Sequence, residues 1–172
     1  MRVLVLSCNT GEGHNSTARA LKECFEARGH FCQTEDALEF ISPAFSRFVS
    51  GGHTLVYRYA PFAFRFGYKC TEGCEDAFCE GSAVYKLLTG SSDKLLDFCA
   101  EGGFDALVST HVFPALMAGA LVKNRNLDIK TYYVTTDYTL TPGTGQSAPA
   151  LCFIPDKALH EVFTAGGVDD GL

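Results

Sequence analysis

The sequence lacks any apolar run long enough to cross a bilayer, and it lacks an excess of basic residues. No window approaches the roughly 18 consecutive apolar residues that a membrane-spanning helix needs, so any membrane association is expected to be peripheral. Lysine and arginine together number 14, against 20 aspartates and glutamates, which gives a formal net charge of −6. An acidic chain without a basic stripe argues against broad binding to nucleic acids.

The sequence also lacks a secretion signal and a recognisable metal motif. The apolar stretch before Cys8 is far too short for a signal peptide. Cys70, Cys74 and Cys79 form no CxxC pair and have no matching second half. The eight cysteines are therefore expected to be reduced thiols, several of them packed as small hydrophobes. We expect a cytoplasmic protein with no metal and no cofactor.

The composition is that of one folded domain. The chain has 172 residues, of which 47% are hydrophobic and 20% are charged. These proportions place it among folded proteins with a core of their own.

An apolar run that breaks into a glycine-rich turn is the most informative stretch. Residues 2–6 have the length and β-branched content of a buried strand, and residues 15–28 have helical spacing. Gly11 and Gly13 permit close approach of the backbone to a ligand, and the amides at the start of the next helix favour anionic or strongly polar groups. His14 is expected at the mouth of this turn, where a histidine suits proton transfer.

The strand–turn–helix pattern recurs along the chain. Further strands are predicted over residues 31–35, 104–109, 130–136 and 150–154, and helices over 83–88, 92–100, 113–121 and 156–165. This alternation indicates an α/β fold, with a Rossmann-like, mostly parallel sheet and helices on both faces. In such sheets ligands bind beyond the carboxyl ends of the strands.

Polar residues follow four of the predicted strands, and the alternation predicts that several of them gather in one crevice. They are residues 9–14, Asp36, residues 110–111 and residues 135–137. Asp36 and Asp137 also suit the capping of a turn or helix, and His111 suits a hydrogen bond to backbone at a helix start. Both the functional and the structural interpretation remain open for these three residues.

Asp36 raises a second functional hypothesis, a nucleotide- or dinucleotide-binding module that uses Gly11 and Gly13. It lies about twenty residues beyond the glycine turn, as in a dinucleotide-binding βαβ unit. The turn reads Gly-Glu-Gly-His-Asn-Ser, however, and lacks the third glycine or alanine of that fingerprint.

An aromatic and locally basic segment spans residues 42–69. It reads as an amphipathic helix or a pair of helices divided at Pro61. Its aromatic side either packs on the sheet or meets lipid headgroups and acyl chains. The second alternative gives a third hypothesis, a non-catalytic membrane-binding domain.

Three stretches resemble one enzyme family. Residues 4–7 (LVLS), followed by residues 11–14 (GEGH) and Ala18, resemble the opening of the monogalactosyldiacylglycerol synthase and processive diacylglycerol glucosyltransferase family, which is related to the bacterial lipid II-forming glycosyltransferase. Residues 108–114 (VSTHVFP) resemble its Ser-x-His-Pro-Phe element, and residues 134–137 (VTTD) its Val-x-Thr-Asp element. The resemblance covers essentially the whole chain.

The resemblance implies the N-terminal half of a two-domain GT-B glycosyltransferase. Residues 1–172 would form a single acceptor-binding domain, and a C-terminal domain absent from this chain would bind the UDP-sugar. The implied reaction transfers a hexose, with inversion, to diacylglycerol or a related lipid. The fragment alone is expected to be inactive.

The resemblance also implies roles for individual residues. His14 matches the general base, Asp137 is a candidate to orient that histidine or the acceptor, and His111 is expected to line the same cleft. The implied substrate-binding residues are Asn9, Thr10, Gly11, Glu12, Gly13, His111 and Asp137. The implied contacts with the acceptor lipid, at the inner face of the cell membrane, are Tyr59, Phe62, Phe64, Arg65, Phe66 and Tyr68.

Overall fold

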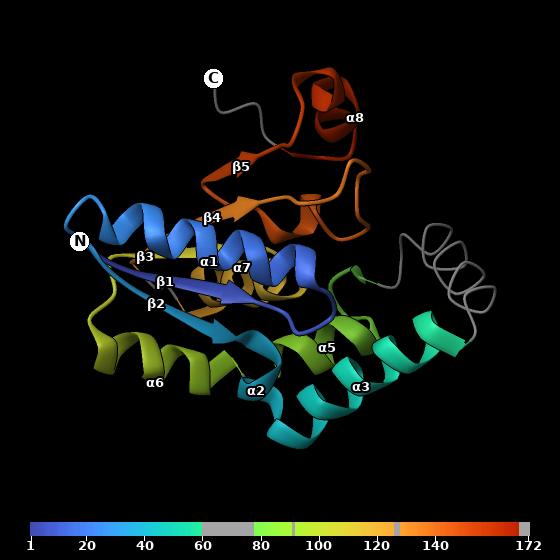
Figure 1. The fold of residues 1–172 in the computed structure, drawn as a ribbon, viewed down its shortest axis with the longest axis horizontal. Helices are drawn as coiled ribbons and strands as arrows, with labels where there is room; N and C mark the ends of the chain where they lie inside the picture. Colours follow the sequence, from blue (N-terminus) through green and yellow to red (C-terminus); the bar gives the residue numbers. More distant parts are fainter. Residues whose placement is uncertain (60–77, 91, 126–127, 169–172) are drawn as a thin grey trace.

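A five-stranded parallel sheet organises the molecule (Figure 1). The structure is a computed structural model, and it describes residues 1–59, 78–90, 92–125 and 128–168. Its strands are β1 (Arg2–Ser7), β2 (Phe31–Asp36), β3 (Ala106–Ser109), β4 (Lys130–Val134) and β5 (Leu151–Phe153). They lie in the order β2-β1-β3-β4-β5, and every neighbouring pair is parallel. The carboxyl ends of all five strands therefore lie at the same edge of the sheet, and the predicted Rossmann-like α/β fold is confirmed.

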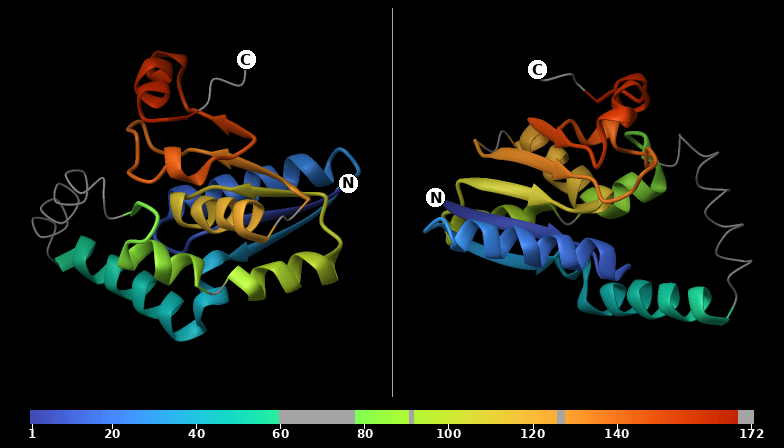
Figure 2. Two further views of the ribbon diagram at one scale, coloured as in Figure 1. Left: turned by 180° about the vertical axis from the view of Figure 1, so that it is seen from behind. Right: turned by 45° about the horizontal axis from the view of Figure 1, so that its top comes forward.

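Helices cover both faces of the sheet. They are α1 (Glu12–Glu26), α2 (Ala37–Ile41), α3 (Pro43–Tyr59), α5 (Ala83–Thr89), α6 (Ser92–Gly102), α7 (Val112–Arg125) and α8 (His160–Ala165), with the 3-10 turns η2 (Gly145–Ser147) and η3 (Lys157–Leu159). Helix α1 lies on one face, and α7 lies on the opposite face (Figure 2). Among the described residues, no helix combines the length and apolarity that crossing a membrane requires.

Strand β1 shows why the sequence folds into this layered arrangement. Its residues from Val3 to Leu6 are fully buried, as expected for a central parallel strand with both faces covered. Val3 and Val5 belong to the small core cluster beneath α1, which includes Ala18 of that helix. Leu4 and Leu6 point the other way, into the larger core that also includes buried residues of α2, α5, α6 and α7.

Several predicted element boundaries differ from the structure by a few residues, and the start of α1 and the last predicted helix are two of them. Helix α1 begins at Glu12, so the second glycine and His14 lie in its first turn and not in a loop before it. The helix predicted over 156–165 is divided into η3 and α8, because the Asp156 carboxylate caps a 3-10 turn by accepting from the Ala158 N–H at 2.8 Å. Of the predicted helical segment 42–69, α3 accounts for the part up to Tyr59, and Pro61 lies outside the described residues.

The Asp36 carboxylate has a structural role. Asp36 is the last residue of β2, and its carboxylate accepts a hydrogen bond from the Leu38 N–H at 3.1 Å and caps α2. Its second oxygen accepts from the Ser46 hydroxyl of α3 at 2.5 Å. This is the capping interpretation that the sequence left open for Asp36.

Candidate active site

The segments that follow β1, β3 and β4 meet around the imidazole of His14. Its Nδ1 lies 2.9 Å from the carbonyl oxygen of Thr110, which follows β3, and 2.8 Å from the hydroxyl oxygen of Thr136, two residues beyond β4. The ring of His111 packs edge-on against it, with 4.5 Å between ring centroids and 78° between ring planes. His14, Thr136 and the adjacent pair of Thr110 and His111 come from three segments that are far apart in the sequence, and the parallel sheet brings these segments together.

The partners of His14 determine which of its ring nitrogens carries the proton. A carbonyl oxygen has no hydrogen to donate, so the short contact with Thr110 requires Nδ1 to be the donor. In the neutral ring, Nε2 then has no proton and presents a lone pair. The side chain of His14 is half-buried, so the protein holds the imidazole in place while part of it remains accessible.

His111 is held in the opposite tautomer. Its Nδ1 accepts a hydrogen bond from the Phe113 N–H at 3.1 Å, and a nitrogen that accepts carries no proton. The proton of the neutral His111 ring is therefore on Nε2. His111 directly precedes α7, and its carbonyl accepts from the Ala115 N–H at 3.2 Å, so the residue caps this helix and also contacts the His14 ring. The Nδ1 atom of His111 therefore has the helix-capping role that the sequence left open for this residue.

A network of side chains holds the turn between β1 and α1. The Ser7 hydroxyl donates to the Asn15 amide oxygen at 2.7 Å, and the Asn15 amide nitrogen donates to the Asn9 amide oxygen at 2.8 Å. The Glu12 carboxylate points to Arg19, 3.3 Å away, and both side chains are largely exposed. Asn9 and Asp36 also line one polar hollow beside the start of α1.

The two glycines of the turn have open space beside them at the start of α1. A Cβ at Gly13 would meet no atom within 4 Å, and one at Gly11 would meet the His14 ring only at 4.0 Å. Gly11 is extended at φ 177°, and Gly13 is not among the glycines with a left-handed backbone. Neither packing nor backbone conformation therefore requires a glycine at these two positions.

The structure does not pair Asp137 with His14. Among the described residues, its carboxylate accepts a hydrogen bond from the Thr141 hydroxyl at 3.4 Å and makes none to His14. Burial, and after it the charge of Asp137, raises the pKa of Tyr133 well above its usual range. Thr110 and Thr136 are not among the residues predicted to contact His14, although both lie within the motifs that carry the family resemblance.

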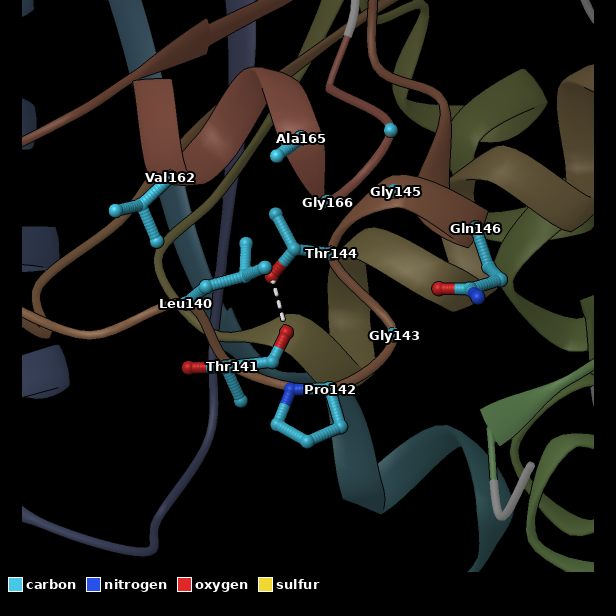
Figure 3. A pocket seen from close by; sticks show the side chains of 11 residues that line it. Leu140, Thr141, Pro142, Gly143, Thr144, Gly145, Gln146, Val162, Ala165 and Gly166 are labelled. Carbon is cyan, nitrogen blue, oxygen red and sulfur yellow. Dashed lines mark hydrogen bonds between the residues drawn. The ribbon is translucent and has the colours of Figure 1, made fainter. Parts of the chain in front are cut away.

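A larger pocket of about 590 Å³ lies elsewhere, between the loop after β4 and α8 (Figure 3). Its lining includes Leu140, Val162 and Ala165, and the Thr144 hydroxyl donates to the Thr141 carbonyl at 2.7 Å within it. None of the described residues that line this pocket has a titratable side chain, and His14 is not among them.

The predicted lipid contacts fall at the limit of what the structure describes. Tyr59 is the last residue of α3, and Phe62, Phe64, Arg65, Phe66 and Tyr68 lie outside the described residues. In the described part of the chain, no three His, Cys, Asp or Glu residues are grouped so that they could hold a metal ion.

Comparison with known proteins gave one finding. Residues 14–171 match the family model described as monogalactosyldiacylglycerol (MGDG) synthase. Neither the search of curated proteins nor that of solved structures gave a match. The matched range begins at His14 and includes Thr110, His111 and Thr136, so it covers the residues that converge on the imidazole.

Proposed function

The chain belongs to the monogalactosyldiacylglycerol (MGDG) synthase family, and we propose that it is the acceptor-binding domain of an inverting lipid glycosyltransferase with His14 as general base. Membership of the family identifies a lipid glycosyltransferase domain. The proposed reaction transfers a hexose from a UDP-sugar to diacylglycerol or a related lipid. A C-terminal domain outside this chain would bind the UDP-sugar, so the chain alone would be inactive.

One observation carries the proposed role of His14. Its Nδ1 is occupied by the Thr110 carbonyl, which leaves the Nε2 lone pair to accept a proton. In the proposed step, the acceptor O–H bond breaks and its proton moves to Nε2 while the oxygen forms a bond to the anomeric carbon. The bond from that carbon to the nucleoside diphosphate breaks, and its electron pair leaves on the phosphate oxygen. General base catalysis of this kind contributes typically about 10²–10⁴-fold.

The surroundings of His14 suit a polar acceptor headgroup. The open space beside Gly11 and Gly13 lies at the start of α1, where unpaired backbone N–H groups favour oxygen ligands. Asn9, Thr10, Glu12, Gly13, His111 and Asp137 complete the proposed substrate-binding set with Gly11. The aromatic residues between Tyr59 and Tyr68, with Arg65, are proposed to contact the lipid at the inner face of the cell membrane.

Replacing His14 in the full-length enzyme tests the proposal. His14→Ala should lower kcat by about 10²–10⁴-fold, the usual contribution of a general base, while the affinity for the nucleotide sugar stays unchanged. His30→Ala is the matched control, because His30 follows α1 at the opposite edge of the sheet and packs on Phe25. Turnover of His14→Ala within a few-fold of that of the control would reject His14 as the base.

Titration of this chain separates the dinucleotide hypothesis from the proposed one. The Asp36 carboxylate is occupied by the Leu38 N–H and the Ser46 hydroxyl, which favours the capping role over a contact with a ribose. We therefore expect no appreciable heat on titration with NAD or with UDP-sugars. Micromolar binding of NAD would favour the dinucleotide-binding module instead.

A further inference from the structure

The Nδ1 atom of His14 lies close to two oxygens, one from the segment after β3 and one from the segment after β4. The Thr110 carbonyl is separated from His14 by 96 positions in the sequence, and the Thr136 hydroxyl by 122. The carbonyl is backbone, fixed in turn because the Thr110 N–H donates to the Leu6 carbonyl of β1 at 3.0 Å. The carbonyl favours the tautomer with the proton on Nδ1, and the Thr136 hydroxyl adds a second oxygen at the same N–H, so this second contact needs an explanation of its own.

Thr135 takes the structural role at the end of β4. Its N–H and its hydroxyl both donate to the Phe153 carbonyl, at 2.9 and 3.1 Å, and so join this segment to β5. Thr135 is buried, whereas Thr136 is half-buried and its hydroxyl meets His14. The side chain that stabilises the segment and the side chain that meets the imidazole are therefore different residues.

Two oxygens on one N–H constrain the ring more than one does. A single hydrogen bond leaves the imidazole free to pivot about its acceptor, whereas a second oxygen 2.8 Å away restricts the direction in which the opposite nitrogen points. When Nε2 gains a proton, the ring becomes a cation, and its Nδ1–H then makes a charge-assisted hydrogen bond. Both oxygens lie where they stabilise that cation.

We propose that Thr136 is a positioning residue for His14, whose hydroxyl aims Nε2 at the acceptor hydroxyl and stabilises the protonated ring. This inference rests on the proposed role of His14 as base. Thr136 acts through the imidazole, and no contact between Thr136 and either substrate is needed.

Three variants of the full-length enzyme test this role. Thr136→Val keeps the branched shape but removes the hydroxyl, and it should lower kcat about ten- to a hundredfold, the size expected for a hydrogen bond to a charged group, with KM for the nucleotide sugar unchanged. Thr136→Ser keeps the hydroxyl and should restore kcat to within about threefold of the wild type. Thr135→Val is the matched control, because it removes a neighbouring hydroxyl hydrogen bond that does not involve His14. It should lower the melting temperature and leave kcat unchanged.

The tautomer of His14 gives a readout that does not depend on activity. In ¹⁵N NMR of the 172-residue chain, neutral His14 should carry its proton mainly on Nδ1, and Thr136→Val should lower that Nδ1–H fraction while Thr135→Val does not. Wild-type kcat and an unchanged tautomer ratio in Thr136→Val would overturn the inference. If the ratio shifts in Thr136→Val but His14→Ala retains full turnover, Thr136 positions the ring and the proposed base is wrong.

Discussion

Gly13 and Gly29 form a matched pair whose replacement by alanine should have opposite effects on stability. Both are exposed, and a Cβ built on either meets no atom within 4 Å. They differ in backbone conformation, because Gly13 lies in the first turn of α1 and Gly29 has φ +77°. Gly13→Ala should raise the free energy of unfolding by up to about 1 kcal/mol, since alanine is the better helix former. Gly29→Ala should lower it by about 1–2 kcal/mol, the cost of a left-handed L-residue.

The same pair tests whether the acceptor approaches the backbone at Gly13. A methyl group at position 13 would occupy open space at the start of α1, where the acceptor headgroup is proposed to bind. An extra methyl in a filled site costs about 1–3 kcal/mol, so KM for the lipid acceptor should rise about five- to 150-fold in Gly13→Ala. Gly29→Ala should leave KM unchanged, because Gly29 lies beyond the other end of α1.

Thermal unfolding of the chain and kinetics of the full-length enzyme are the two measurements. For a protein of this size, 1 kcal/mol corresponds to about 2–4 °C in melting temperature, so the two variants should differ by several degrees and in opposite directions from the wild type. A lower melting temperature for Gly13→Ala would refute the assignment of Gly13 to a helical turn with free space. A more stable Gly13→Ala enzyme with unchanged KM would refute close approach of the acceptor.

Two further predictions concern His111 and the buried thiols. His111→Ala should lower the free energy of unfolding by about 1 kcal/mol in urea melts, because α7 loses its cap, whereas His111→Asn should keep most of that stability. Both variants should lower the turnover of the full-length enzyme if the His111 ring lines the acceptor site. Burial raises the pKa of the Cys99 and Cys152 thiols from 9.0 to about 11. Between pH 9 and pH 11 the thiols of the unfolded chain lose protons that the thiols of the folded chain retain, so deprotonation favours the unfolded chain. The urea midpoint should therefore fall as the pH rises from about 9 to 11. A midpoint that is flat or rising over this range, both in the wild type and in Cys99→Ala, would contradict this prediction.

The sheet could be predicted from the sequence because its signals are local. The strands β1 and β3 are short runs of mostly apolar and β-branched residues, and they are buried on both faces. The start of α1 could not be predicted as well. Gly11 and Gly13 are poor helix formers, and the helix begins there without a side-chain cap, stabilised instead by packing of residues such as Ala18 on the sheet.

The meeting of polar strand ends could also be predicted, but the choice between Thr136 and Asp137 could not be read from residue type. The family resemblance makes Asp137 the candidate to orient either the histidine or the acceptor, and it names no such role for Thr136. The sequence did carry the relevant signal in its alternation. Tyr132 and Val134 pack with the cluster beneath α1, and the period of two places Thr136, not Asp137, on the same side of the sheet as His14.

The position of His14 relative to its partners therefore depends on the register of the sheet. Leu6 pairs with Ser109, and Ser109 pairs with Tyr133, so the segments after β3 and β4 emerge beside the end of β1 and the start of α1. A slip of one residue between β3 and β4 would turn Thr136 to the other face and bring Thr135 or Asp137 toward His14. The residues that hold this register are buried core residues with no chemistry of their own. Substitutions among them that leave the chain folded but shift β4 should thus lower turnover without any change at His14.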